Sequence, residues 1–308
     1  MEILLQVLLL AVGFVMLVKG ADWFVDGSSG IAAKFKIPQI VIGLTIVAMG
    51  TSAPEAAVSI TAALKGNAGI TIGNIVGSNI LNVLIILGLS AVVTPLAVTK
   101  STIKVDIPVM IAITGILLWM GYDGTVTLLE GIILLLIFAS YIGYLMYVAF
   151  KDRKQNTEEA EEISVLKALI WTVVGLVLIV WGSDVTVDAA TKIAKILGLS
   201  ERFIGLTIVA LGTSLPELFT SVMAARKGNA DIAIGNIVGS NIFNILFVVG
   251  LSALVIPVPF LEGFRFDTMV SLAAAVFLFF CVLKNQKLNR WAGVLMLVSY
   301  AAYFAVIL

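Results

Sequence analysis

The same stretch of sequence occurs twice in this chain of 308 residues. The segment from Gly43 to Pro95 recurs without a gap from Gly205 to Pro257, at an offset of 162 residues. About two-thirds of the paired positions are identical, which shared hydrophobicity cannot produce, so the chain contains an internal duplication. In the two most similar parts, GLTIVAMGTSAPE recurs as GLTIVALGTSLPE, and GNIVGSNILN recurs as GNIVGSNIFN. Any fold for this chain must therefore contain two copies of one structural unit.

Both copies consist of apolar runs that are long enough to cross a lipid bilayer. Hydrophobic residues make up 60% of the chain and charged residues 12%, whereas a soluble domain carries about 25% charged residues. A run of about 20 apolar residues is the length of a membrane-spanning helix and is far longer than a barrel strand. We expect about ten such helices, at residues 3–21, 37–64, 69–93, 105–121, 127–150, 164–183, 203–225, 231–256, 268–284 and 291–308.

The clearly polar stretch KDRKQNTEEAEE separates the two copies. It predicts a first repeat at 1–150, a cytoplasmic linker at 151–163 and a second repeat at 164–308. With five spans in each repeat, an odd number, the second repeat must enter the membrane from the opposite side. The predicted fold is an all-α membrane protein of ten transmembrane helices, arranged as two inverted five-helix repeats around a midplane site.

The basic residues predict the orientation of these helices. About fourteen of the 19 Lys and Arg residues lie on one side, in or beside the connections after the odd-numbered spans, and Lys and Arg concentrate on the cytoplasmic side. We therefore expect a multi-pass protein of the cell membrane with both termini outside the cell. The net charge of zero gives no indication of nucleic-acid binding.

Glu55 and Glu217 are the strongest candidates for a functional site. They occupy equivalent positions in the two copies, within apolar segments that are almost free of charge. A charged side chain at the centre of a spanning helix costs about 2.5–3.5 kcal/mol on insertion scales. No basic residue lies deep in any predicted span, so a bound cation is the compensation we expect.

Residues beside the two glutamates can supply further oxygen ligands. Pro54 and Pro216 lack an amide hydrogen, so each predicts a broken helix with free backbone carbonyls. Thr51 and Thr213 each precede their glutamate by four residues and share its helix face. In the second motif, Ser78 with Asn82 and Ser240 with Asn244 share a face in the same way. Their alternative role is close helix packing through the GxxxG pairs of the same motif.

The candidate ligands are oxygen atoms without imidazole or sulfur, because the chain has no histidine and its one cysteine, Cys281, lies in an apolar run. This set suits a hard cation such as Ca2+, which takes 6–8 oxygen ligands. The same absences leave a membrane enzyme without the usual nucleophile and base. Asp22 and Asp26 recur as Asp184 and Asp188. We expect these aspartates to lie in water at ordinary helix ends. The alternative is that they attract cations to an entrance of the site.

At the two repeated motifs the chain resembles the cation/calcium exchanger superfamily, specifically its small prokaryotic sodium/calcium exchangers, over essentially its whole length. The resemblance implies electrogenic exchange of three Na+ for one Ca2+ by alternating access. It also implies long, tilted first and sixth helices, no cofactor, and a monomer surrounded by membrane lipid. The implied ligands are the side chains of Glu55, Glu217, Thr51, Thr213, Ser78, Ser240, Asn82 and Asn244, and the backbone carbonyls of Ala48 and Ala210.

Two departures from the family pattern and two alternatives bear on this interpretation. Ala53 replaces a usual leucine, and Asn244 stands where some relatives carry aspartate, which weakens the case for potassium co-transport. A Ca2+/H+ exchanger of the same fold is the first alternative, although proton-coupled relatives usually place an acidic residue in the second motif. A cation channel is the second, although channels commonly gather their ligands by rotational symmetry between subunits.

Overall fold

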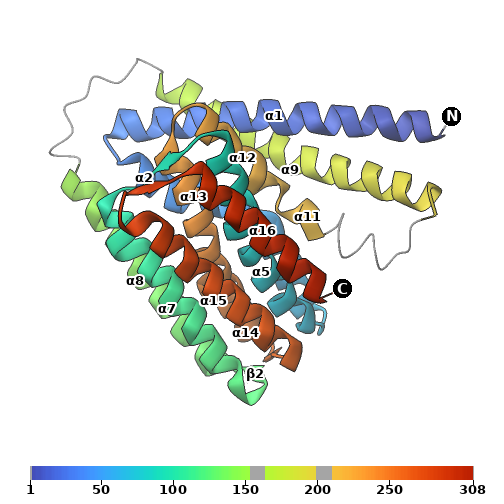
Figure 1. The fold of residues 1–308 in the computed structure, drawn as a ribbon, viewed down its shortest axis with the longest axis vertical. Coiled ribbons are helices and arrows are strands. Elements are labelled where there is room, and N and C mark those ends of the chain that lie inside the picture. The colour runs from blue at the N-terminus through green and yellow to red at the C-terminus, as the bar shows by residue number, and fades with distance from the viewer. Residues whose placement is uncertain (1, 153–163, 199–209, 308) are drawn as a thin grey trace.

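Helices make up almost all of the described chain (Figure 1). The computed structural model describes residues 2–152, 164–198 and 210–307. The helices of the first copy are α1 Glu2–Phe35, α2 Gln39–Ile42, α3 Ala48–Thr51, α4 Ala53–Leu64, α5 Gly69–Leu81, α6 Gly88–Val93, α7 Ile107–Met120 and α8 Leu128–Asp152. Those of the second are α9 Val165–Ile196, α11 Ala210–Thr213, α12 Leu215–Arg226, α13 Ala230–Phe243, α14 Gly250–Val255, α15 Glu262–Leu283 and α16 Arg290–Ile307.

Tighter and wider helical turns join several of these helices. The π-helical segments are η1 Gly43–Val47, η2 Asn82–Leu87, η3 Thr102–Asp106 and η6 Asn244–Val249, and a 3-10 turn, η4, covers Gly121–Asp123. Asn82 and Asn244 therefore begin π-helical segments at equivalent positions of the two copies. Such segments are frequent at functional sites.

The described residues contain eight helices that are long and apolar enough to cross a membrane, or nine if one bent pair is a single span. The bent pair is Gln39–Thr51 with Ala53–Leu64. Of the ten predicted spans, the one at 203–225 begins at residues outside the described part of the chain, and α11 and α12 form the rest of it. The predicted linker is also described only at its start, where α8 continues through Lys151 and Asp152.

The first and sixth helices are longer than the apolar runs that predict them. The expected spans 3–21 and 164–183 are too short, because α1 continues to Phe35 and α9 to Ile196. Charged residues interrupt the apolar run after Ala21, but Phe24, Ser28 and Ala32 continue a buried stripe at helical spacing. The charged side chains occupy the other faces, so the helix continues where the hydropathy signal ends.

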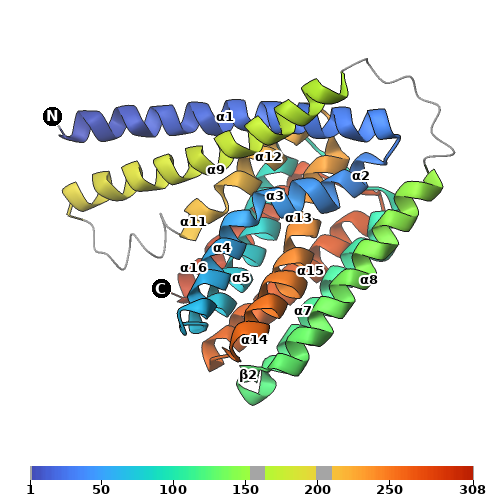
Figure 2. The same ribbon diagram turned by 180° about the vertical axis from the view of Figure 1, so that it is seen from behind.

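Helices α1 and α9 pack side by side and cross the rest of the bundle steeply (Figures 1 and 2). Small residues make this contact close: a Cβ added to Gly20 would lie 2.9 Å from the Gly175 carbonyl oxygen. Near one end of the pair Gly13 contacts Gly182, and near the other Gly27 contacts Ala168. The two helices, which begin the two copies, are therefore antiparallel.

The two copies of the GNIVGSN segment form the centre of the bundle. In the spans Gly69–Val93 and Ala230–Val255, 78% and 83% of an apolar stretch of 18 residues is buried inside the protein. The corresponding share is 17–28% for α1, α8, α9 and α16. Helix α13 packs against η1 and α3 of the first copy, so the copies interlock there. Polar residues of the repeated motif are therefore held away from lipid.

Two short antiparallel strand pairs, which the sequence analysis does not predict, also join the copies. Strand β1, Leu96–Ala97, pairs with β4, Lys287–Leu288, and β2, Thr125–Val126, pairs with β3, Val258–Pro259. Each strand lies 162 residues from its counterpart in the other copy, so the two pairings are equivalent.

Candidate cation site

Both GTS-x-PE motifs break their helix at the serine. Ser52, with φ −82° and ψ 8°, separates α3 from α4, and the helix axis bends there by 50°. Ser214, with φ −91° and ψ 4°, separates α11 from α12 in the same way. The broken helices predicted from Pro54 and Pro216 are thus present, with each proline in the first turn of the new helix, where its missing N–H costs nothing.

Glu55 and Glu217 lie in the first turns of α4 and α12, and each residue is 1% exposed. The positive end of a helix dipole favours a carboxylate there. Each carboxylate accepts a hydrogen bond from the other copy. Ser52 Oγ donates to Glu217 Oε1 at 2.7 Å, and Ser214 Oγ donates to Glu55 Oε1 at 3.4 Å. The two carboxylates are also close enough to repel each other, so the fold brings them into one site.

Two asparagines that the sequence analysis omits from its ligand set hold the broken helices in position. Asn74 Nδ2 donates to the Glu55 backbone oxygen at 3.3 Å and to Ser59 Oγ at 2.9 Å. Asn236 makes the equivalent bonds, to the Glu217 backbone oxygen at 3.4 Å and to Ser221 Oγ at 2.9 Å. The sequence contained a signal for them, because Asn74 precedes Ser78 by four residues and so shares its face.

Thr51 belongs to the same network. Its Oγ1 donates to Asn236 Oδ1 at 2.9 Å and lies 3.3 Å from the carbonyl oxygen of Ala48. Ser240 Oγ also reaches the Ala48 carbonyl, at 3.4 Å. The Ala48 carbonyl, which the family resemblance implies as a ligand, therefore lies between a side chain of its own copy and one of the second copy. Its counterpart Ala210 begins α11, but its side chain lies outside the described part of the chain.

The second motif forms a reciprocal asparagine cluster between the copies. Asn79 and Asn241 each donate from Nδ2 to the other's backbone oxygen at 3.2 Å. Asn82 Nδ2 donates to Asn241 Oδ1 at 2.9 Å, and Asn244 Nδ2 donates to Asn79 Oδ1 at 3.1 Å. The amide hydrogens of Asn82 and Asn244 thus bind protein acceptors, which leaves their oxygens available.

Four buried acceptor oxygens of the two motifs, two from each copy, have no hydrogen-bond partner within the described residues. They are Glu55 Oε2, Glu217 Oε2, Asn82 Oδ1 and Asn244 Oδ1. Leaving a buried polar atom without a partner costs about 1–3 kcal/mol, and more for a charged group. All four can accept but not donate, so a cation would satisfy them and an anion would not. An oxygen-only set of this kind fits a hard cation such as Ca2+.

The remaining predicted ligands differ in exposure. Thr51, Ser78 and Ser240 are buried, whereas Thr213 is half-buried. Thr213 lines a cavity of about 410 Å³ together with Pro54, Asp184 and Asp188. Thr51 of the first copy is buried in the protein, whereas its counterpart Thr213 in the second copy lines the cavity. The equivalent halves of the site are therefore not in equivalent conformations.

The aspartate pairs show the same asymmetry. Lys227 at the end of α12 contacts the carboxylates of Asp22 and Asp26, each at 2.6 Å. The expectation of helix ends is wrong in position, because α1 continues to Phe35 and α9 to Ile196. Asp22 and Asp26 stay 33% and 36% exposed, and their basic partner comes from the other copy. The equivalent lysine, Lys65, forms no ion pair with the described residues. Its matching aspartates, Asp184 and Asp188, line the cavity instead.

Comparison with known proteins identifies related chains over the full length. The family model described as "Sodium/calcium exchanger protein" matches residues 5–147 and 167–308. The "Putative antiporter CaxA" of Alkalimonas amylolytica is 39% identical over 97% of this chain and 98% of its own. The "Sodium/calcium exchanger MaX1" of Methanosarcina acetivorans is 34% identical over 97% of both chains. A structure of the sodium-calcium exchanger NCX_Mj superimposes with a TM-score of 0.87 at 34% identity, over 99% of this chain and 100% of the other.

Proposed function

The chain belongs to the sodium/calcium exchanger family, and on that premise we propose that it exchanges Ca2+ for Na+ across the cell membrane through the site between Glu55 and Glu217. The observation that carries the proposal is the set of four buried acceptor oxygens, two from each copy, that have no donor among the described residues. Each ion would be a substrate held by the two carboxylates and by neutral oxygens. In the described residues no group of three or more His, Cys, Asp or Glu side chains could hold a metal ion, so the two glutamates would supply the negative charge of the site.

Competition for these carboxylates would couple the two ions. One Ca2+ or two Na+ would neutralise the pair, and either load would let the site change its access, whereas the bare pair of charges would resist the change. A third Na+ would leave one positive charge to cross the membrane. That charge makes the exchange sensitive to voltage, by about 2.3 kcal/mol per 100 mV. The ratio of three Na+ to one Ca2+ follows from the family resemblance.

We further propose that the two copies are inverted repeats of five spans each, 1–150 and 164–308, with the site near the midplane. The antiparallel contact of α1 with α9 supports this arrangement, because these helices begin the two copies. The reciprocal pairing of β1 with β4 and of β2 with β3 also supports it. The basic connections would then face the cytoplasm and both termini the outside, and one chain would suffice as a monomer.

Alternating access would exchange the conformations of the two halves. In the first copy Asp22 and Asp26 bind Lys227. In the second copy Asp184 and Asp188 line the cavity beside Thr213. In the opposite state Lys65 would bind Asp184 and Asp188, and a matching cavity would open beside Thr51. On the proposed orientation the present cavity opens toward the outside.

The test is uptake of radioactive Ca2+ by purified protein in liposomes. An outward-directed Na+ gradient should drive uptake. A potential that is positive outside should hinder uptake, because three Na+ leaving for each Ca2+ entering carry one net positive charge outward. A pH gradient of equal size, without Na+, should drive none. Uptake driven by the pH gradient alone would show a Ca2+/H+ exchanger instead, and flux that needs no counter-ion would show a channel.

A further inference from the structure

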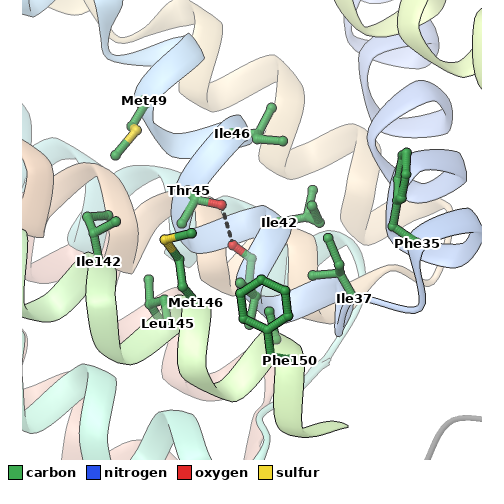
Figure 3. A pocket seen from close by; sticks show the side chains of 12 residues that line it. Phe35, Ile37, Ile42, Thr45, Ile46, Met49, Ile142, Leu145, Met146 and Phe150 are labelled. Carbon is green, nitrogen blue, oxygen red and sulfur yellow. Dashed lines mark hydrogen bonds between the residues drawn. The ribbon is translucent and has the colours of Figure 1, made fainter. Parts of the chain in front are cut away.

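A second cavity, of about 530 Å³, lies away from the cation site, between the first half of the broken helix and α8 (Figure 3). Its walls are apolar, and they include Ile46 and Met49 on one side and Leu145, Met146 and Phe150 on the other. Thr45 is the one polar residue among the described residues that line it, and its Oγ1 donates to the Val41 carbonyl oxygen at 2.6 Å. The walls therefore offer nothing to a polar ligand and suit a hydrocarbon chain.

This cavity opens toward the lipid-facing surface. Met146 and Phe150 are 54% and 63% exposed, although both are large apolar residues of a helix that we place in the membrane. Such side chains contact lipid tails. An occupant can enter sideways from the bilayer without crossing water.

Basic side chains lie beside the cavity in sequence. Lys34 and Lys36 flank the lining residue Phe35, and Lys151 follows the lining residue Phe150. All three lysines are exposed, and none forms an ion pair with the described residues. Three exposed lysines thus adjoin, along the chain, residues that line the apolar cavity.

The backbone at Lys36 has a conformation that favours glycine. Helix α1 ends with Lys36 at φ +54°, a left-handed conformation that glycine adopts at least cost. The equivalent residue of the second copy is Gly198, at φ +78°. The same helix end therefore accepts glycine, and a lysine there carries a strain of about 1–2 kcal/mol. Lys34 is likewise replaced, by Ile196, so the second copy lacks the counterparts of these two lysines.

We propose that this cavity binds a phospholipid, with an acyl chain inside it and an anionic headgroup at Lys34, Lys36 and Lys151. On the proposed orientation these lysines lie at the cytoplasmic leaflet, whose anionic lipids attract basic residues beside a span. The acyl chain of the lipid would pack against η1 and α3. Helix α3 ends at Thr51, one residue before the break at Ser52. Bound lipid would therefore support the half of the broken helix that leads into the cation site.

Thermal unfolding of the purified full chain in mild detergent tests the ligand. We would compare phosphatidylglycerol, phosphatidylcholine with the same acyl chains, and glycerol phosphate. Phosphatidylglycerol should raise Tm by several degrees more than phosphatidylcholine, and glycerol phosphate should leave Tm unchanged. Equal shifts from the two phospholipids would overturn the role of the lysines. An equal shift from glycerol phosphate would overturn the role of the cavity.

Variants test the residues. Lys36→Gly should raise Tm without lipid, because it removes the backbone strain. It should also reduce the part of the Tm increase that phosphatidylglycerol gives beyond phosphatidylcholine. Lys34→Gln combined with Lys36→Gln should remove that additional increase. Lys284→Gln, which removes an exposed lysine elsewhere, is the control. Ala149→Phe or Met146→Trp should fill the cavity and abolish the shift from both phospholipids. A wild-type response in the lysine variants would overturn the proposal even if a cavity variant failed to fold. Failure of Na+-driven Ca2+ uptake would leave these binding results unaffected.

Discussion

Ser52 of the first copy donates a hydrogen bond of 2.7 Å to the carboxylate of Glu217 in the second copy. The reciprocal bond, from Ser214 to Glu55, is longer at 3.4 Å. Each glutamate is thus oriented by the break in the other copy's helix. The other oxygen of each carboxylate has no donor among the described residues. Because these bonds cross between the copies, a movement of either copy changes the surroundings of both glutamates.

Replacing either glutamate by glutamine should abolish Ca2+ exchange. Glu55→Gln or Glu217→Gln removes one of two negative charges and places an amide donor near the cation. We expect Na+-driven Ca2+ uptake to fall by at least about 100-fold, in line with a lost interaction of 3 kcal/mol or more. The folded state should persist, because the charged pair is costly to bury. Uptake in liposomes and Tm in detergent check the two parts, and near-normal uptake in either variant would refute the site.

Removing the serine hydroxyls should have smaller and unequal effects. A hydrogen bond to a charged group contributes about 1.5–3 kcal/mol, or roughly 10–100-fold in affinity. Ser52→Ala should therefore raise the Ca2+ concentration for half-maximal uptake about 10-fold or more, and Ser214→Ala, with its longer bond, should raise it less. Ser52→Thr, which keeps the hydroxyl, is the matched control. The prediction fails if both alanine variants bind Ca2+ as the wild type does.

Breaking the contact of Lys227 with Asp22 and Asp26 should loosen the closed half of the protein. Lys227→Gln should increase hydrogen exchange of the backbone amides in residues 22–30, because α12 no longer holds that part of α1. Lys65→Gln is the matched variant in the other copy, and it should leave exchange in this segment unchanged since Lys65 forms no ion pair with the described residues. Equal exchange in the two variants would contradict a closing role for Lys227.

Enlarging a glycine between α1 and α9 should disrupt their packing. A Cβ at Gly20 would lie 2.9 Å from both the Gly175 oxygen and the Ile179 nitrogen, which are backbone atoms that cannot rotate away. Gly20→Val should lower the free energy of unfolding by about 1–3 kcal/mol. It should also slow the proposed Ca2+ exchange, in which we expect these helices to move together. Gly143→Ala is the control, because a Cβ there meets no atom within 4 Å. Equal Tm and uptake in the two variants would rule out the predicted strain.

Local signals in the sequence were sufficient for several features. The proline after GTS predicts the breaks at Ser52 and Ser214, because a missing amide hydrogen acts within one helical turn. The burial of Glu55 and Glu217 follows from their place in apolar runs. Hydropathy predicts too short an α1. It averages over all faces of a helix, so it does not detect the buried face that includes Phe24 and Ser28, nor the helix α9 that packs against α1. Whether the predicted side chains ligate Ca2+ and Na+ stays a prediction.

Composition and the repeated segments thus establish a helical membrane protein built from two copies, with one buried glutamate in each. They do so because hydrophobicity, helix breaks and duplication are properties of neighbouring residues. Only the packing of one copy against the other settles which oxygens remain free, because the hydrogen bonds of Asn82, Asn244 and both glutamates cross between the copies. It also settles that Asp22 and Asp26 bind Lys227 while Asp184 and Asp188 line a cavity. The two copies adopt these different arrangements because each copy's contacts depend on the position of the other.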